Sequence, residues 1–154
     1  AKIGKVDNLI LNQAIDNFEI KSYETSLDIK DFDNSFVKGL SFEDGCATLT
    51  KFTAYLIVDG LRKINKQNNV NPHQYIFCGG GRKNKFLMQS IKNYLVSKNI
   101  IIKDIDDYNF DGNFIESQAF AYLAIRSYLK LPISFPSTTR CKKAISGGDV
   151  LKNF

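Results

Sequence analysis

The stretch YIFCGGGRKN, residues 75–84, decides how the middle of this chain folds. It begins with four apolar residues, and a short apolar run that stops at glycines is typical of a buried strand in a parallel sheet. Gly79, Gly80 and Gly81 then leave the backbone bare at the end of that strand. Ligands of α/β proteins bind at this edge of the sheet, and the amino end of a following helix favours a negatively charged group.

Two interpretations of residues 78–84, called here the glycine loop, remain open at this point. The loop lacks the GxxxxGK[ST] pattern of a Walker A motif and the GxGxxG pattern of dinucleotide-binding folds. It is therefore either a nucleotide-binding turn of another kind or a tight connection between a strand and a helix.

Helical and strand patterns surround the glycine loop. Upstream, apolar residues recur at helical spacing over about residues 42–66, behind Ser41 and Asp44, which have the spacing of a capping box. Downstream, the apolar stripe of residues 86–95 predicts a second helix, and residues 100–102 predict a second strand. This order predicts a βαβ unit.

A third helix is predicted from Asn113 to about Lys130. Its apolar residues occur on all sides, so we expect it to be largely buried. Glu116 follows Asn113 by three residues, which fits either a capping box or a role in ligand binding or catalysis. Since only two strands are predicted, and a two-stranded parallel sheet is a poor independent structure, the sequence predicts a helix-rich α/β fold with an incomplete sheet.

We expect residues 1–154 to form a single domain. Residues 1–40 are predicted to be an irregular amino-terminal extension with one amphipathic helix. Residues 41–131 are predicted to form a helix-strand-helix-strand-helix core, and residues 132–154 a carboxyl-terminal loop segment. With 44% apolar and 24% charged residues, the composition is typical of a globular protein rather than a disordered one.

Charge, hydropathy and cysteine content argue against several classes of protein. The net charge of +5 comes from short, scattered basic clusters, so no nucleic-acid partner is expected. No apolar run approaches the roughly 20 residues that cross a bilayer, so no membrane partner is expected either. Cys46, Cys78 and Cys141 form neither a CxxC pair nor a disulfide framework, which favours the reducing cytoplasm.

Two further motifs carry little weight. Residues 107–112 resemble the start of a calcium loop, but Gln118 stands at the twelfth position and a predicted strand precedes the segment, so no metal site is expected. His73 follows Pro72 and has no partner at a diagnostic spacing. We expect it to be an ordinary surface or strand-entry residue.

Several separate motifs stand in a fixed order along the chain. They are GLS (39–41) with DGCATLT (44–50), CGGGRKN (78–84), DGNFIESQAFAYLAIRSY (111–128) and LPISFPSTT (131–139). Together they closely resemble the C-terminal part of anhydro-N-acetylmuramic acid kinase over about residues 33–150, and a weaker motif at residues 26–28 extends the match. The resemblance implies a partial actin-like ATPase (ribonuclease H-like) C-terminal lobe.

The resemblance also implies an activity. Enzymes of that family open the 1,6-anhydro ring of a recycled cell-wall amino sugar with water and transfer the γ-phosphoryl group of ATP to its O6. ATP and Mg²⁺ are therefore the implied cofactors, and the amino sugar is the implied small-molecule partner. The residues that the resemblance assigns to nucleotide binding are Gly79, Gly80, Gly81, Arg82 and Asn84. It assigns Glu116 and Asp111 to the sugar cleft.

Parts of the family pattern are changed or missing here. The family's catalytic aspartate loop and first phosphate loop have no counterpart in these residues, so no catalytic residue is assigned. A Pro-Lys-Ser…Arg stretch of the family appears as Glu24-Thr25-Ser26…Ile29, and Arg140 replaces a glycine. These departures suit either a lobe that requires a separately encoded N-terminal lobe or the remnant of a decayed kinase gene. The expected protein partner is that separate lobe or a second copy of the chain in a homo-oligomer. The alternative function is a non-catalytic nucleotide-binding or interaction module.

Overall fold

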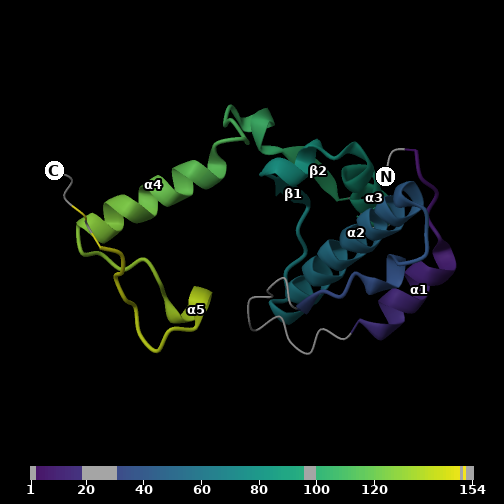
Figure 1. The fold of residues 1–154 in the computed structure, drawn as a ribbon. Helices are drawn as coiled ribbons and strands as arrows, with labels where there is room; N and C mark the ends of the chain where they lie inside the picture. Colours follow the sequence, from purple (N-terminus) through teal and green to yellow (C-terminus); the bar gives the residue numbers. More distant parts are fainter. Residues whose placement is uncertain (1–2, 19–30, 96–99, 150, 152–154) are drawn as a thin grey trace.

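The computed structural model describes residues 3–18, 31–95, 100–149 and 151, which form a helix-rich body and a carboxyl-terminal part that extends from it (Figure 1). The elements are α1 (Asn8–Asn17), η2 (Ser35–Val37), α2 (Phe42–Gln67), β1 (Gln74–Phe77), η3 (Gly80–Lys83), α3 (Lys85–Leu95), β2 (Ile101–Asp104), η5 (Ile105–Tyr108), α4 (Ile115–Tyr128) and α5 (Pro136–Thr139). The altered stretch 24–29, with the motif at 26–28, lies outside the described residues.

The long helix α2 begins where the capping pattern predicts. Ser41 Oγ accepts a hydrogen bond from the backbone amide of Asp44 at 3.1 Å. The Asp44 carboxylate is engaged elsewhere, because it accepts a hydrogen bond from the backbone amide of Lys5 at 2.7 Å. This contact lowers the pKa of Asp44 and ties the amino-terminal segment to the start of α2.

Strand β1, helix α3 and strand β2 form the predicted βαβ unit. The strands are parallel, with Gln74 opposite Ile101 and Phe77 opposite Asp104. Helix α3 packs on α2 beneath the sheet, and the buried residues of their common core are Ala54, Val58, Ile91 and Leu95. This packing gives the apolar stripes of both helices the partner that their periodicity predicts.

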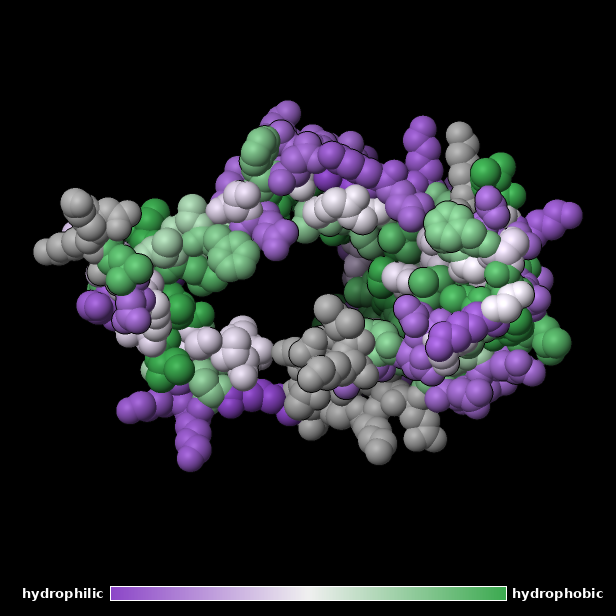
Figure 2. All heavy atoms as spheres, viewed as in Figure 1, coloured by the Kyte–Doolittle hydropathy of each residue, from purple (hydrophilic) through white to green (hydrophobic). Residues whose placement is uncertain are grey.

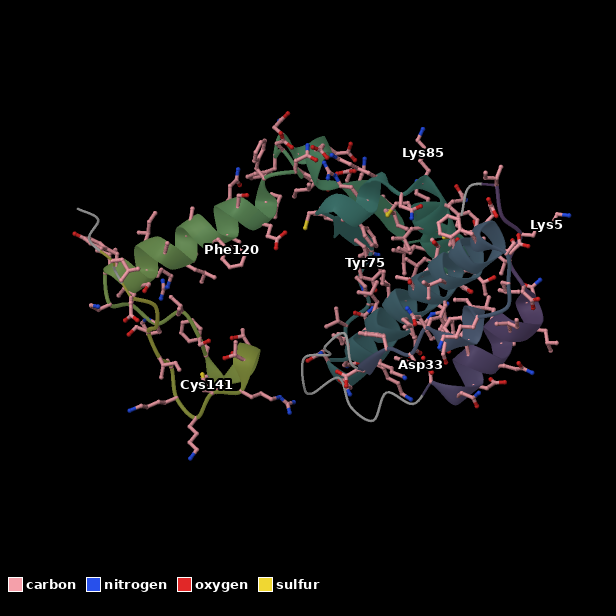
Figure 3. The ribbon with its side chains drawn as sticks, in the orientation of Figure 1. Lys5, Asp33, Tyr75, Lys85, Phe120 and Cys141 are labelled. Atoms are coloured by element: carbon pink, nitrogen blue, oxygen red, sulfur yellow. The ribbon has the colours of Figure 1, made fainter. Side chains whose placement is uncertain are left out.

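The described elements cover one of the two faces of the sheet. Tyr75, Phe77 and Ile102 pack against the core, and Figure 3 shows Tyr75 between the sheet and α2. On the other face, Ile76 and Ile101 are 47% and 54% exposed. The prediction of a buried strand is therefore wrong for this face, because none of the described elements packs on it. Within the described residues each strand also has one unpaired edge.

The described residues of the amino-terminal extension include the amphipathic helix α1, as predicted. Asp7 caps α1 through its side chain, and Leu11 and Ala14 of α1 pack with Phe52 of α2. The rings of Phe36 and Phe52 meet edge to face, with centroids 5.0 Å apart. The described residues of the extension thus pack along α2.

Helix α4 does not have the burial predicted for it. None of its residues is buried, and it lies apart from the α2–α3 body in Figure 1, with an open space between them in Figure 2. Phe120 and Ile125 are 64% and 59% exposed. The prediction fails because burial needs a second apolar surface, and no described element supplies one.

The segment that follows α4 is not entirely loop. It contains the short helix α5 and an isolated antiparallel bridge between Ser134 and Ile145. Across the described ranges, no helix has both the length and the apolar character needed to cross a bilayer. All three cysteines are free, with Cys78 exposed and the other two half-buried.

Candidate functional site

The glycine loop lies at the carboxyl end of β1. Gly79 has a φ of 81° and a ψ of 174°, a conformation that residues with side chains rarely adopt, so the turn requires glycine there. Residues Gly80–Lys83 then form the short helix η3, and Asn84 leads into α3. Because β1 and β2 run parallel, the turn that follows β2 lies at the same edge of the sheet.

The backbone of the glycine loop is open. A Cβ built at Gly79 or Gly80 would have no heavy atom within 4 Å, and one at Gly81 would meet Leu87 Cδ2 at 3.8 Å. Gly80 is exposed and does not have a positive φ. Neither packing nor backbone conformation therefore demands a glycine at position 80, and the backbone there is accessible from outside the loop.

Asn84 caps helix α3. Its Oδ1 accepts a hydrogen bond from the backbone amide of Leu87 at 3.1 Å, and its carbonyl accepts one from the amide of Met88 at 3.0 Å. Its own amide donates to the carbonyl of Gly81 at 3.0 Å. The side chain thus caps α3, and the contact of Asn84 with a nucleotide stays a prediction.

The Arg82 side chain is turned inward and is 6% exposed. Its Nε donates to Asp104 Oδ1 at 3.0 Å and to Asp106 Oδ2 at 2.9 Å. Its Nη2 donates to Asp106 Oδ2 at 2.7 Å, and its Nη1 donates to the carbonyl of Gly79 at 3.0 Å. The guanidinium thus joins the glycine loop to the turn after β2, while its direct contact with a nucleotide remains a prediction.

These contacts favour the charged forms of both partners. The pKa of Asp106 falls from its ordinary value of 3.8 to about 2, first through the hydrogen bond from the Gly112 amide at 3.0 Å and further through Asp104 and Arg82. The hydrogen bond with Asp106 raises the pKa of Arg82. At neutral pH the two carboxylates and the guanidinium together carry a net negative charge.

Sequence reasoning did not identify Asp104 and Asp106 as partners of Arg82. The signal was available, because both aspartates follow the second predicted strand and Arg82 follows the first. Parallel neighbours bring such residues to one edge of the sheet. Gly112 was also missed as a contact, although it is buried and a Cβ there would lie 2.6 Å from Arg82 Cζ.

The two sugar-cleft candidates lie after η5, and both are exposed. Asp111 Oδ1 accepts hydrogen bonds from the backbone amide and the side-chain nitrogen of Asn113, at 2.9 and 2.8 Å. Glu116 lies in the first turn of α4. The N-cap residue of this helix is Phe114, which makes no capping hydrogen bond through its side chain. The capping box considered for Asn113 and Glu116 is therefore wrong, because the Asn113 side chain bonds Asp111 instead.

In the described ranges, no group of three or more histidine, cysteine, aspartate and glutamate side chains is arranged to hold a metal ion. Within the calcium-like segment, the Asp107 carboxylate accepts a hydrogen bond from the backbone amide of Asp104 at 3.3 Å. His73 is exposed, and its carbonyl accepts a hydrogen bond from Ile101 at 2.9 Å. It is a strand-entry residue, as expected.

A family model and several curated proteins that match this chain all carry the same family description. The family model described as anhydro-N-acetylmuramic acid kinase matches residues 16–153. The anhydro-N-acetylmuramic acid kinase of Pelagibacter ubique is 57% identical over 157 residues, covering 100% of this chain and 41% of the relative. The corresponding protein of Caulobacter vibrioides is 37% identical and covers 98% of this chain and 39% of the relative. Anhydro-N-acetylmuramic acid kinase 2 of a Jannaschia species is 34% identical, covering 96% and 37%.

The match has the same extent in each of these relatives. The chain is covered almost completely, whereas it spans about two fifths of the length of the curated relatives it matches. The glycine loop, Asp111 and Glu116 all lie within the matched residues 16–153.

Proposed function

Because the chain belongs to the anhydro-N-acetylmuramic acid kinase family, we propose that it forms the C-terminal part of such a kinase and supplies a nucleotide-binding loop. The reaction converts 1,6-anhydro-N-acetylmuramate, ATP and water to N-acetylmuramate 6-phosphate and ADP. The observation that carries the proposal is the open backbone at Gly80, at the carboxyl end of β1.

The loop has the chemistry that a nucleotide requires. Close approach to the backbone is possible at Gly79 and Gly80, because neither carries a side chain and the space beside each is open. Asn84 holds the amino end of α3 directly behind the loop, where helix amides favour a negative charge. Bound ATP with Mg²⁺ would supply the phosphoryl group, and positioning and charge stabilisation would be the protein's main contribution.

The acidic residues of the next segment are proposed to face the sugar. Asp111 and Glu116 are exposed and therefore accessible to a small polar ligand. Asp111 is held by its hydrogen bonds with Asn113, so its carboxylate has a defined place at the entrance to α4. The free cysteines are compatible with a cytoplasmic location, where the recycled sugar and ATP would be available.

The remaining part of the kinase is the proposed partner of this chain. The relatives are about two and a half times as long, and the family's catalytic aspartate loop has no counterpart in these residues. Such a lobe would cover two exposed apolar surfaces. They are the face of the sheet at Ile76 and Ile101, and the apolar helix α4. A second copy of this chain is the other candidate occupant.

Calorimetry with ADP and ATP tests the nucleotide role. We expect the chain to bind nucleotide and Gly80→Val to weaken binding about tenfold or more, since the valine would occupy the open space beside the loop. Gly147→Ala is the matched control, because its Cβ would make an ordinary contact with Ile133 Cδ1 at 3.5 Å, outside the glycine loop.

Circular dichroism establishes whether each variant is folded. Equal nucleotide affinity of the wild type and folded Gly80→Val would mean that the loop is only a turn between β1 and α3. An absence of binding by the wild-type chain would contradict the proposal that these residues retain a nucleotide site.

A further inference from the structure

We infer that Arg82 is a positioning residue, which bridges the glycine loop to the turn after β2 and thereby holds the open backbone at Gly79 and Gly80 in place for its ligand. The part concerning the ligand rests on the proposed function. The bridge itself rests on contacts between described residues alone.

Arg82 contacts two segments at the carboxyl end of the sheet, the glycine loop and the turn after β2. On one side its Nη1 donates to the carbonyl of Gly79, the first glycine of the loop. On the other side, Nε and Nη2 reach the carboxylates of Asp104, the last residue of β2, and Asp106, within η5. The planar guanidinium can make these contacts simultaneously, whereas a lysine ammonium lacks the same fork of donors.

Asp106 extends the bridge to a third segment. Its Oδ2 accepts from Arg82, and its Oδ1 accepts from the backbone amide of Gly112 at 3.0 Å. Gly112 is buried, and a Cβ there would lie 2.6 Å from Arg82 Cζ and 2.7 Å from Ile105 Cγ2. Arg82 therefore occupies the space that a side chain at position 112 would need, so the loop and the turn pack as one unit.

The same bridge controls the charge beside the loop. Without Arg82, the carboxylates of Asp104 and Asp106 would stand uncompensated at the edge where an anionic ligand is proposed to bind. Exposed ion pairs contribute little to stability, but the Arg82 side chain is 6% exposed and makes four hydrogen bonds. We expect its loss to act locally, on the loop and on ligand affinity.

Hydrogen exchange of the full chain tests the bridge directly. In Arg82→Ala, amide exchange across residues 79–84 and at Gly112 should accelerate about tenfold or more, while exchange in the α2–α3 core stays unchanged. Arg82→Lys should restore part of the protection. Lys83→Ala is the matched control, because it removes the same charge from a neighbouring exposed residue and should leave exchange at Gly112 unchanged.

A double-mutant cycle tests whether Arg82 and Gly112 act together. Gly112→Ala should loosen the same amides as Arg82→Ala, and the effects of the two substitutions should add only in part, since the first displaces the guanidinium that the second removes but also meets Ile105 Cγ2. Exchange in Arg82→Ala that matches wild type, or that rises equally in the core, would overturn the positioning role.

Calorimetry with ADP separates this inference from the proposed function. If wild type binds ADP, Arg82→Ala should bind at least about tenfold more weakly without a matching loss of overall fold. Equal affinity would overturn the role toward the ligand. If wild type does not bind ADP, the proposed function and the ligand role both fail, and the exchange data decide whether the bridge exists.

Discussion

Asn84 performs a structural task that can be measured apart from any ligand. Its Oδ1 accepts the amide of Leu87 and so satisfies one of the free donors at the start of α3. Asn84→Ala should lower the free energy of unfolding by about 1 kcal/mol, and Asn84→Asp should retain most of the stability because it keeps the acceptor. Urea unfolding of the three proteins measures this, and equal stability of wild type and Asn84→Ala would contradict the assignment.

Asp106 predicts a pH dependence of stability with a definite sign. Its pKa is lowered to about 2 in the folded chain, so its contribution is fully present above its ordinary pKa of 3.8 and is lost as the pH falls toward about 2. The stability difference between wild type and Asp106→Asn should therefore shrink across that window. Thermal unfolding of both proteins at several pH values is the measurement, and a constant difference would contradict the prediction.

Helix caps are features of single residues that a sequence predicts well. The caps at Ser41 and Asn84 act within a few residues, so the spacing of polar and apolar residues is enough to predict them. The bridge from Arg82 to Asp104 and Asp106 spans 22 and 24 residues. The predicted βαβ unit indicates that these residues lie at one edge of the sheet, but sequence spacing does not show which side chains meet there.

At the scale of elements, the sequence predicts α2 and α3 within one or two residues of their observed ends, whereas the prediction that α4 is largely buried is wrong. Helical periodicity is a property of the local sequence, so it predicts a helix whether or not another element packs against it. Burial requires another surface, and α4 has no buried residue among those described. Figure 3 shows the Phe120 side chain on the side of α4 that faces the open space.

This exposure predicts self-association through α4. Replacing Phe120 and Ile125 with serine should shift the chain toward monomer, because both apolar side chains are more than half exposed. Gln118→Ser, on the same helix, is the matched control, since it introduces a serine without removing an apolar group. Sedimentation velocity measures the change.

Circular dichroism gives the companion readout for the α4 variants. The melting of the α2–α3 core should be the same in the double variant and in Gln118→Ser, since α4 takes no part in that core. An unchanged distribution of oligomers in the double variant would exclude α4 as the associating surface.

For the whole molecule, we expect the 154-residue chain alone not to phosphorylate anhydro-N-acetylmuramic acid. It spans about two fifths of the relatives, and no residue of it matches the family's catalytic aspartate loop. An assay with ATP, Mg²⁺ and the sugar measures the activity, with a full-length relative as the positive control. Turnover on the order of 1 to 10³ per second would mean that these residues contain a complete active site.

Cys78 is a natural labelling site at the end of β1, where the glycine loop begins. Cys78 is an exposed residue next to Gly79, whereas Cys46 and Cys141 are half-buried. A thiol-reactive fluorophore would therefore attach preferentially beside the loop, without an engineered cysteine. The chain thus carries its own labelling position, from which changes in emission would report events at the carboxyl end of β1.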